Sequence, residues 1–221
     1  MQDGKTEKLV SLITSKTKLP IKKVLVVGCG TGIEAAILAQ NLRAEVVGID
    51  IKDEFEFDAE AAKYCTLMEA DATNMPFENN TFDFVYSFHA LEHINKPTVA
   101  VSEIKRVLKH DGLVWIGTPN RSRWIGSIGS KRGTALQKLK WNMIDWKYKL
   151  KGKFRNEFGA HAGFTSRELQ SILSKEFSMV ENETRNYYLA IYATKKNFIQ
   201  MIYNVGLSKY LLPAIYFFAK K

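Results

Sequence analysis

The sequence predicts an α/β fold: a Rossmann-like, doubly wound arrangement around a mostly parallel sheet. Short apolar runs rich in β-branched residues alternate with helix-like segments through residues 24–118. This alternation is typical of βαβ units, whose strands are parallel. The first apolar run, 24–27, leads straight into three glycines at every second position, Gly28, Gly30 and Gly32. A glycine turn between a strand and a helix is typical of sheets that bind nucleotides at their strand ends.

Each expected element has its own local signal. Apolar runs indicate strands, helical periodicity indicates helices, and Pro20 ends the first helix. Thr165, followed three residues later by Glu168, forms a capping box that begins a late helix. In chain order we expect a helix at 6–16, a strand at 24–27, a helix at 33–42, a strand at 45–51, a helix at 59–64, strands at 65–70 and 82–88, a helix at 98–108, a strand at 113–118, a helix at 165–175 and two closing strands at 179–185 and 187–194.

Length and composition set the class of protein. The chain has 221 residues, of which 46% are hydrophobic and 25% charged; this suits one globular domain and excludes wholesale disorder or a polytopic membrane protein. Two cysteines, Cys29 and Cys65, cannot build a disulfide-rich secreted scaffold. Residues 1–20 contain no apolar leader segment. We therefore expect a cytoplasmic protein, with one domain at 1–196 and an apolar helical tail at 197–221.

A basic helical insert is expected at 121–160, after the fifth strand. Residues 121–155 hold 11 Lys and Arg but a single acid, Asp145, so this segment carries the excess behind the net charge of +9. Apolar residues recur there at helical steps of three and four: Leu136, Leu139, Met143, Trp146 and Leu150. A basic amphipathic helix with Trp is typical of a membrane interface, and the same features can bind phosphate-rich substrates or RNA. A further interpretation is a lid helix that packs its apolar stripe on the sheet edge.

The C-terminal segment is mostly apolar over 198–218, and Lys209 and Pro213 interrupt the run. These interruptions disfavour a membrane-spanning helix. An apolar segment of this length does not remain exposed to water. We therefore expect a helix or helical hairpin that lies on a membrane surface, on a partner subunit or on the body of the domain.

Acidic residues follow two of the expected strands, at the edge where an open α/β sheet binds its ligands. Asp50 lies 20 residues after Gly30, at the end of the second strand. A carboxylate at this point can accept both hydroxyls of a ribose. Asp71 and Ala72 close the third strand, where a second carboxylate can accept the amino group of an adenine. The strand ends together predict a nucleoside-binding site.

Four stretches resemble the class I S-adenosylmethionine-dependent methyltransferases, in the type 11-like subgroup that methylates small molecules, lipids and glycans. They are VLVVGCGTG (24–32), VVGIDI (46–51), EADATNMPFENNTFDFVYSFHALEHI (69–94) and EIKRVLKHDGLVWIGTPN (103–120). The resemblance extends over residues 20–195. One position departs from the family: Val26 stands where an acid usually helps to orient the methionine amino group.

The resemblance implies a seven-stranded sheet in the order 3-2-1-4-5-7-6, with strand 7 antiparallel. It also implies S-adenosylmethionine as the cofactor and S-adenosylhomocysteine as its product. The residues implied to bind the cofactor are Gly28, Gly30 and Gly32 around the methionine part, Asp50 at the ribose, Ile51 on the adenine ring, Asp71 and Ala72 at the adenine amine, and Phe88 near the sulfonium.

Histidines near the strand ends are the candidates for catalysis. Methyl transfer to a hydroxyl needs a base for the departing proton, and we expect His89 and His161 to serve. His93 is a further candidate, whereas His110 lies in a turn at the far edge of the sheet. Some relatives in the resembled family carry Glu-x-x-Glu-His at this place and bind a divalent metal. A transition-metal site of His89, Glu92, His93 and His161 therefore stays an alternative, and no metal is included among the expected sites.

The expected activity is methyl transfer from S-adenosylmethionine to a hydroxyl of a small-molecule, lipid-linked or glycan acceptor. Contact with the periphery of a membrane is expected through 121–155 and 198–218. Two alternatives stay open: an RNA methyltransferase that uses the basic insert, and a protein that binds the cofactor without turnover, for which Val26 is the indication. Nucleic acid is the less favoured partner. The sequence leaves the acceptor atom and the oligomeric state open.

Overall fold

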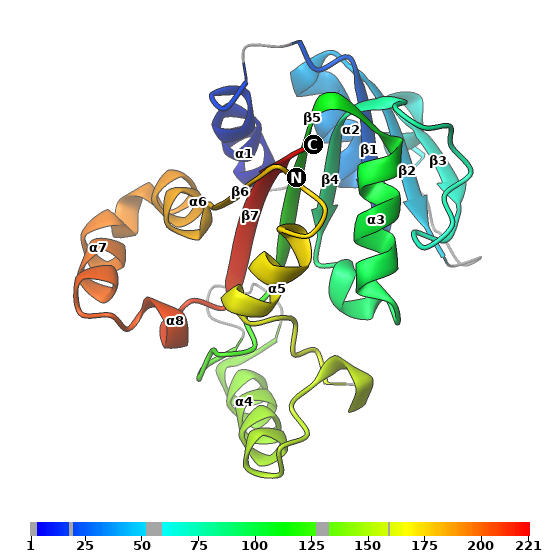
Figure 1. Cartoon of the computed structure of the whole chain (residues 1–221). Helices are drawn as coiled ribbons and strands as arrows, with labels where there is room; N and C mark the ends of the chain where they lie inside the picture. Colours follow the sequence, from blue (N-terminus) through cyan, green and yellow to red (C-terminus); the bar gives the residue numbers. More distant parts are fainter. Residues whose placement is uncertain (1–3, 18–19, 52–58, 127–132, 159) are drawn as a thin grey trace.

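The computed structural model describes the whole chain except residues 1–3, 18–19, 52–58, 127–132 and 159. Its centre is a seven-stranded sheet in the order β3-β2-β1-β4-β5-β7-β6 (Figure 1). The strands are β1 Lys23–Val27, β2 Glu45–Asp50, β3 Thr66–Glu69, β4 Phe82–Phe88, β5 Leu108–Pro119, β6 Met179–Asn182 and β7 Ala214–Lys220. Strands β1 to β5 pair in parallel, and β7 runs antiparallel to both β5 and β6. The expected fold, strand order and strand orientation are confirmed.

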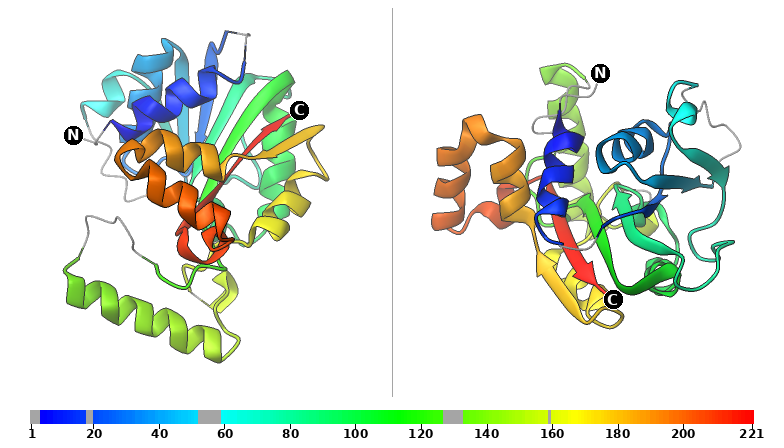
Figure 2. Two further views of the ribbon diagram at one scale, coloured as in Figure 1. Left: turned by 90° about the vertical axis from the view of Figure 1, so that its left-hand side faces the viewer. Right: turned by 90° about the horizontal axis from the view of Figure 1, so that it is seen from above.

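Helices cover both faces of the sheet (Figures 1 and 2). They are α1 Lys5–Thr14, α2 Ile33–Leu42, α3 Pro97–Val107, α4 Ala135–Leu150, α5 Ser166–Leu173, α6 Thr184–Ile191, α7 Lys196–Asn204 and α8 Ser208–Leu211, with 3-10 turns at Ala61–Lys63, Leu91–His93, Asn156–Phe158 and Ala193–Lys195. α1, α2 and α6 pack on one face, over Tyr86 and Trp115, and α3 and α5 pack on the other, over Val85 and Ile116. Alternate residues of β4 and β5 thus enter two cores, as expected at the centre of an α/β sheet.

Most expected elements lie where the sequence places them. α2 and β4 have the expected bounds. The capping box is formed: the Thr165 hydroxyl accepts a hydrogen bond from the Glu168 amide, and the Glu168 carboxylate accepts one from the Thr165 amide. The expected helix at 59–64 is only the 3-10 turn at Ala61–Lys63.

The expected second closing strand, at 187–194, is wrong. Its first residues belong to α6, which buries Tyr187, Tyr188 and Ile191 on one helical face. The run has strong β propensity because it is aromatic and β-branched, but its buried positions follow the helical period.

The expected helical tail at 197–221 is wrong in its last part. Residues 214–220 form β7, which lies between β5 and β6 and is buried on both faces. A strand buried on both faces is apolar throughout and has no alternation that would separate it from a buried helix. The segment is therefore part of the sheet and not a separate tail.

The helix expected in the basic insert is present as α4. It lies apart from the layered body, beyond the carboxyl ends of the parallel strands (Figures 1 and 2). None of the helices in the described part of the chain combines the length and the apolar character needed to span a bilayer.

Candidate active site

A pocket of about 1230 Å³ opens at the carboxyl ends of β1 and β2 and the segment after β4. The strand order reverses at β1, and ligands of open α/β sheets bind at such a switch point. Its volume suits a ligand of nucleoside size or larger. The expected site residues in its wall are Gly28, Gly30, Asp50, Ile51, Asp71, Ala72 and His89.

The glycine turn forms one wall of the pocket. Gly28 has a left-handed φ of 76°, and a Cβ there would lie 2.2 Å from the Cβ of Ala90. Its amide donates a hydrogen bond to the Ile49 carbonyl, which joins the turn to β2. A Cβ on Gly30 would meet none of the described atoms within 4 Å. Gly28 is therefore required by packing, whereas the backbone at Gly30 is open to a ligand.

Asp50 stands at the end of β2 and faces the glycine turn. Its Oδ2 accepts a hydrogen bond from the Gly30 amide at 2.9 Å, and its Oδ1 accepts one from the Ile51 amide at 2.8 Å. These bonds hold the carboxylate in the pocket wall, and each oxygen keeps a lone pair for a further donor. The Ile51 side chain beside it is 61% exposed and gives the pocket an apolar surface.

Asp71 follows β3 on the opposite side of the pocket. Its Oδ1 accepts hydrogen bonds from both the amide and the hydroxyl of Thr73. These bonds lower the pKa of the Asp71 carboxyl, because they favour its charged form. Ala72 is buried next to it. The pair thus presents a fixed carboxylate at the strand end.

Two expected cofactor residues lie outside this pocket wall. Gly32 begins α2 with a φ of 82°, and a Cβ there would lie 2.4 Å from Leu67; its role in the structure is close packing on β3. Phe88 packs its ring against Tyr86, Tyr216 and His89, with the Phe88 and His89 ring centres 4.5 Å apart. Phe88 therefore supports the position of His89 from behind.

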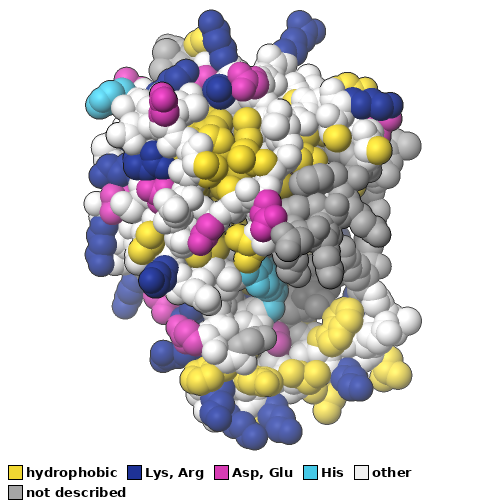
Figure 3. Space-filling view, turned by 90° about the vertical axis from the view of Figure 1, so that its right-hand side faces the viewer, with side chains coloured by type: hydrophobic (Ala, Val, Ile, Leu, Met, Phe, Trp, Pro, Cys, Tyr) yellow, Lys and Arg dark blue, Asp and Glu magenta, His cyan; other side chains and the backbone are white. Residues whose placement is uncertain are grey.

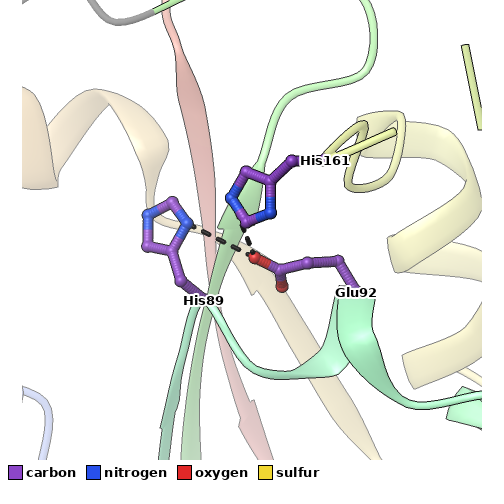
Figure 4. Close-up of side chains that lie close together, drawn as sticks. All are labelled: His89, Glu92 and His161. Atoms are coloured by element: carbon purple, nitrogen blue, oxygen red, sulfur yellow. Dashed lines mark ion pairs between the residues drawn. The ribbon is translucent and has the colours of Figure 1, made fainter. Parts of the chain in front are cut away.

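The two expected catalytic histidines meet at one carboxylate, although they come from distant parts of the chain (Figure 4). His89 Nδ1 lies 3.4 Å from Glu92 Oε1, and His161 Nε2 lies 3.6 Å from the same oxygen. The Glu92 side chain is fully buried, and its two oxygens have no hydrogen-bond donor among the described residues. A buried carboxylate without such donors needs positive charge nearby, and the buried guanidinium of Arg123 interacts electrostatically with Glu92.

His89, Glu92 and His93 do not lie on an α-helix. His89 has a left-handed φ of 55° and precedes the 3-10 turn that contains Glu92 and His93. A non-glycine residue in this region is strained, and such strain gathers at functional sites. The His93 ring lies 4.9 Å from that of His161, at the edge of the cluster.

The electrostatics of the cluster favour a neutral His161. Burial lowers the pKa of its imidazole, and Glu92 opposes this effect by raising it. At neutral pH His161 can therefore accept a proton. The donor atoms of His89, Glu92 and His161 also lie within 4.8 Å of one another. Two imidazoles and one carboxylate are a donor set that could hold zinc or another transition metal.

Two residues near the site escaped the sequence analysis. Glu34 accepts a hydrogen bond from the Tyr86 hydroxyl at 3.1 Å, and burial raises the pKa of its carboxyl. Tyr86 pairs with Val26, so this carboxylate lies near the position where the family acid is missing. Arg123 is buried and donates to the carbonyls of His161 and Ala162. Neither residue has a signal of its own in the sequence, since Glu34 lies in an ordinary helical segment and Arg123 is one of 11 basic residues in 121–155.

The strand order and the strand-end pocket define an α/β protein with a ligand site at the switch point of its sheet. Residues 25–116 match the family model described as methyltransferase domain. The chain is similar to the chloroplastic tocopherol O-methyltransferase of Arabidopsis thaliana, with 32% identity over 132 residues that cover 57% of the chain and 36% of the relative. It is also similar to 24-methylenesterol C-methyltransferase 3 of the same plant, with 34% identity over 126 residues, 51% of the chain and 33% of the relative. The chain spans about a third of the length of these relatives.

Solved structures show the same fold. Phosphoethanolamine N-methyltransferase 2 of Haemonchus contortus, in complex with S-adenosyl-L-methionine, superposes with a TM-score of 0.61 at 20% identity, over 97% of this chain and 52% of that one. The [4+2]-cyclase SpnF superposes with a TM-score of 0.57 at 17% identity, over 97% and 80% of the two chains. One of these two structures is named as a cyclase. The similarity therefore shows the fold, and the reaction has to be inferred from the residues of the site.

Proposed function

We propose that the protein transfers a methyl group from S-adenosylmethionine to a hydroxyl of a small-molecule, lipid-linked or glycan acceptor, with a lipid-like acceptor favoured. The observation that carries the proposal is the place of His89. It lines the same pocket as Gly30 and Asp50 and shares Glu92 with His161. The names of the two curated relatives support a lipid-like acceptor, because one names tocopherol and the other a sterol, and the tocopherol enzyme is named as an O-methyltransferase.

The residues of the pocket fit S-adenosylmethionine. The open backbone at Gly30 would lie along its methionine part, and Asp50 would accept its ribose hydroxyls. Ile51 would cover one face of the adenine, and Asp71 would accept its amino group. Phe88, which is partly buried behind His89, would stay a supporting residue rather than a contact.

For this reaction the protein has to position the two substrates and to accept a proton. When bound, the cofactor supplies a methyl group on a positively charged sulfur, open to in-line displacement. The chain must hold the acceptor hydroxyl in line and exclude water. His161, neutral because burial lowers its pKa, accepts the hydroxyl proton. Glu92 then lies 3.6 Å from the resulting imidazolium and stabilises its charge, and His89 can serve in the same way.

The first test concerns cofactor binding. The purified protein should bind S-adenosylmethionine and S-adenosylhomocysteine in calorimetry. Asp50→Ala should weaken this binding by about 1.5–3 kcal/mol, roughly 10- to 100-fold in Kd, the range for a hydrogen bond involving a charged group. Glu7→Ala removes an exposed acid on α1 and should leave Kd unchanged. No binding to the wild type, or equal affinity in Asp50→Ala, contradicts the proposal.

The second test concerns turnover. Extracts incubated with methyl-labelled S-adenosylmethionine should yield label in the lipid fraction. The double variant His89→Ala/His161→Ala should lower kcat by about 10²- to 10⁴-fold, the usual loss on removing a general base, with the cofactor Kd kept. Cofactor binding without transfer to any fraction supports the binding-protein alternative. Transfer that depends on added zinc and is abolished by a chelator supports the metal alternative.

A further inference from the structure

α4 presents its apolar stripe outward. One interpretation of the sequence packs this stripe on the sheet edge, but Leu136 is 76% exposed and Leu150 is 90% exposed. Leu139, Met143 and Trp146, which complete the stripe, are exposed as well. Asn142 is the buried residue of this helix. The lid interpretation, with the stripe against the sheet, is therefore wrong.

Polar side chains attach α4 to the body instead. The Asn142 side-chain oxygen accepts a hydrogen bond from the Gly126 amide at 2.6 Å. Asp145 forms an ion pair with Arg123 at 3.3 Å, and Lys149 donates to the Arg123 carbonyl. Asn142, Asp145 and Lys149 follow each other at helical steps of three and four, so they share the inner face. An ordinary surface helix buries its apolar face, whereas α4 turns its apolar face to the solvent and its polar anchoring face to the body.

Basic residues border the exposed stripe. Lys140, Lys147 and Lys151 recur at steps of seven and four, on the side of the stripe away from the anchoring face, and all three are exposed. Figure 3 shows hydrophobic side chains in a row along the lower edge of the molecule, where α4 lies in Figure 1, with Lys and Arg side chains beside them. Histidine side chains lie in the hollow above this edge (Figure 3).

We propose that α4 binds the surface of a bilayer that contains anionic lipids. An exposed apolar stripe of this size marks an interaction site. Leucines and tryptophans on one face with lysines at its border match the chemistry of a bilayer interface, where the apolar face enters the acyl boundary and the lysines meet anionic headgroups. A nucleic acid would use the lysines but leave the leucines in water. A second copy of this basic insert would bring like charges together.

The arrangement connects the bilayer to the candidate active site. Arg123, which anchors α4 through Asp145, also donates to the carbonyl of His161 at 3.0 Å. α4 and the pocket both lie at the carboxyl ends of the strands. A protein seated on α4 would therefore meet a lipid-like acceptor at the side of His161. This last step rests on the proposed function, whereas membrane binding itself does not require turnover.

The experiment measures sedimentation of the full chain with vesicles of phosphatidylcholine alone or with 30% phosphatidylglycerol, a composition of about one anionic lipid in three. The wild type should bind the anionic vesicles, with a blue shift of Trp emission. Leu136→Asp/Met143→Asp/Leu150→Asp should weaken binding at least about tenfold, because it places charges in the interface. Ser11→Asp/Ser15→Asp/Gln40→Asp adds the same three charges at exposed polar positions of α1, its C-cap and α2, is the matched control, and should bind as the wild type.

No binding of the wild type to anionic vesicles, or equal binding of the α4 variant, overturns the proposal. Salt-dependent binding to tRNA without vesicle binding would favour a nucleic acid, and a change from dimer to monomer in the α4 variant would favour a second copy; both overturn it. The cofactor Kd, measured in the same variants, should not change. Vesicle binding without cofactor binding would refute the proposed function and leave the membrane proposal standing.

Discussion

At the scale of single residues, the candidate active site is organised around the buried carboxylate of Glu92. Glu92 is buried without hydrogen bonds, yet two histidines 72 positions apart in the chain reach it. Burial lowers the pKa of the His161 imidazole, and Glu92 opposes this effect. The net effect is that the pKa of His161 lies below the ordinary histidine value of 6.5.

This balance predicts a pH profile for the reaction. The base form of His161 is lost as pH falls through its pKa, so the acid limb of kcat/KM should have its midpoint below the ordinary histidine value of 6.5. Glu92 raises this pKa, while burial, His93, His89 and Arg123 lower it. Removing the Glu92 charge in Glu92→Gln should therefore move the midpoint to still lower pH.

The measurement is kcat/KM against pH for the wild type and Glu92→Gln, with Glu78→Gln as the control, an exposed acid in the loop before β4. A midpoint that stays in place or rises in Glu92→Gln contradicts the assigned role.

The lowered pKa of His161 also affects stability. As pH falls through 6.5, the unfolded chain binds the His161 proton before the folded chain does, so this group should lower the free energy of unfolding in that pH range.

At the scale of elements, α6 and β7 show how burial overrides local preference. Tyr187 and Tyr188 have strong β propensity but lie in a helix over the sheet. β7 is apolar at nearly every position because β5 and β6 flank it and both of its faces are covered. Neither element can be assigned from its own residues, since a short apolar run fits both a buried strand and a buried helix.

The position of β7 predicts a contrast between two phenylalanines of the C-terminal segment. Phe217 is 1% exposed in the core, and Phe217→Ala should lower the free energy of unfolding by about 3–5 kcal/mol. Phe198, on α7, is exposed, and Phe198→Ala should change it by less than about 0.5 kcal/mol. Urea denaturation of the two variants measures the difference. Equal small effects would mean that the segment is not part of the core.

At the scale of the whole molecule, the pocket lies on one half of the sheet. The pocket is built on β1, β2, β3 and the end of β4, whereas β5, β7 and β6 close the other side of the sheet. α4 lies beyond both, past the carboxyl ends of the parallel strands. The proposed ligand site and the proposed membrane contact thus lie on separate parts of the molecule.

This layout predicts that a chain ending at Lys196 does not fold. Without β7, the last strand β6 has no neighbour in the sheet, and β5 loses its antiparallel partner. We expect the truncated chain to lose its cooperative thermal transition and, with it, cofactor binding. A chain ending at Lys220 keeps every residue of β7 and is the control. A cooperative transition in the shorter chain would show that the pocket half folds alone.

The sequence by itself determined the parallel half of the sheet and seven of the residues in the pocket wall. The strands β1, β2 and β4, the glycine turn, Asp50 and Asp71 follow local signals, because a βαβ unit brings consecutive strand ends to one edge without further information. The capping box of α5 is equally local. These features depend on residues close together in the chain, and they were predictable for that reason.

Only the tertiary structure decided the rest. The meeting of His89 and His161 at Glu92 requires the chain to return to the strand ends after the insert, and no spacing in the sequence measures that distance. The place of β7 depends on its partners β5 and β6, and the direction of the α4 stripe depends on Asn142 and Asp145 finding their partners on the body. In each case the deciding free energy comes from contacts between distant segments, which local propensity does not contain.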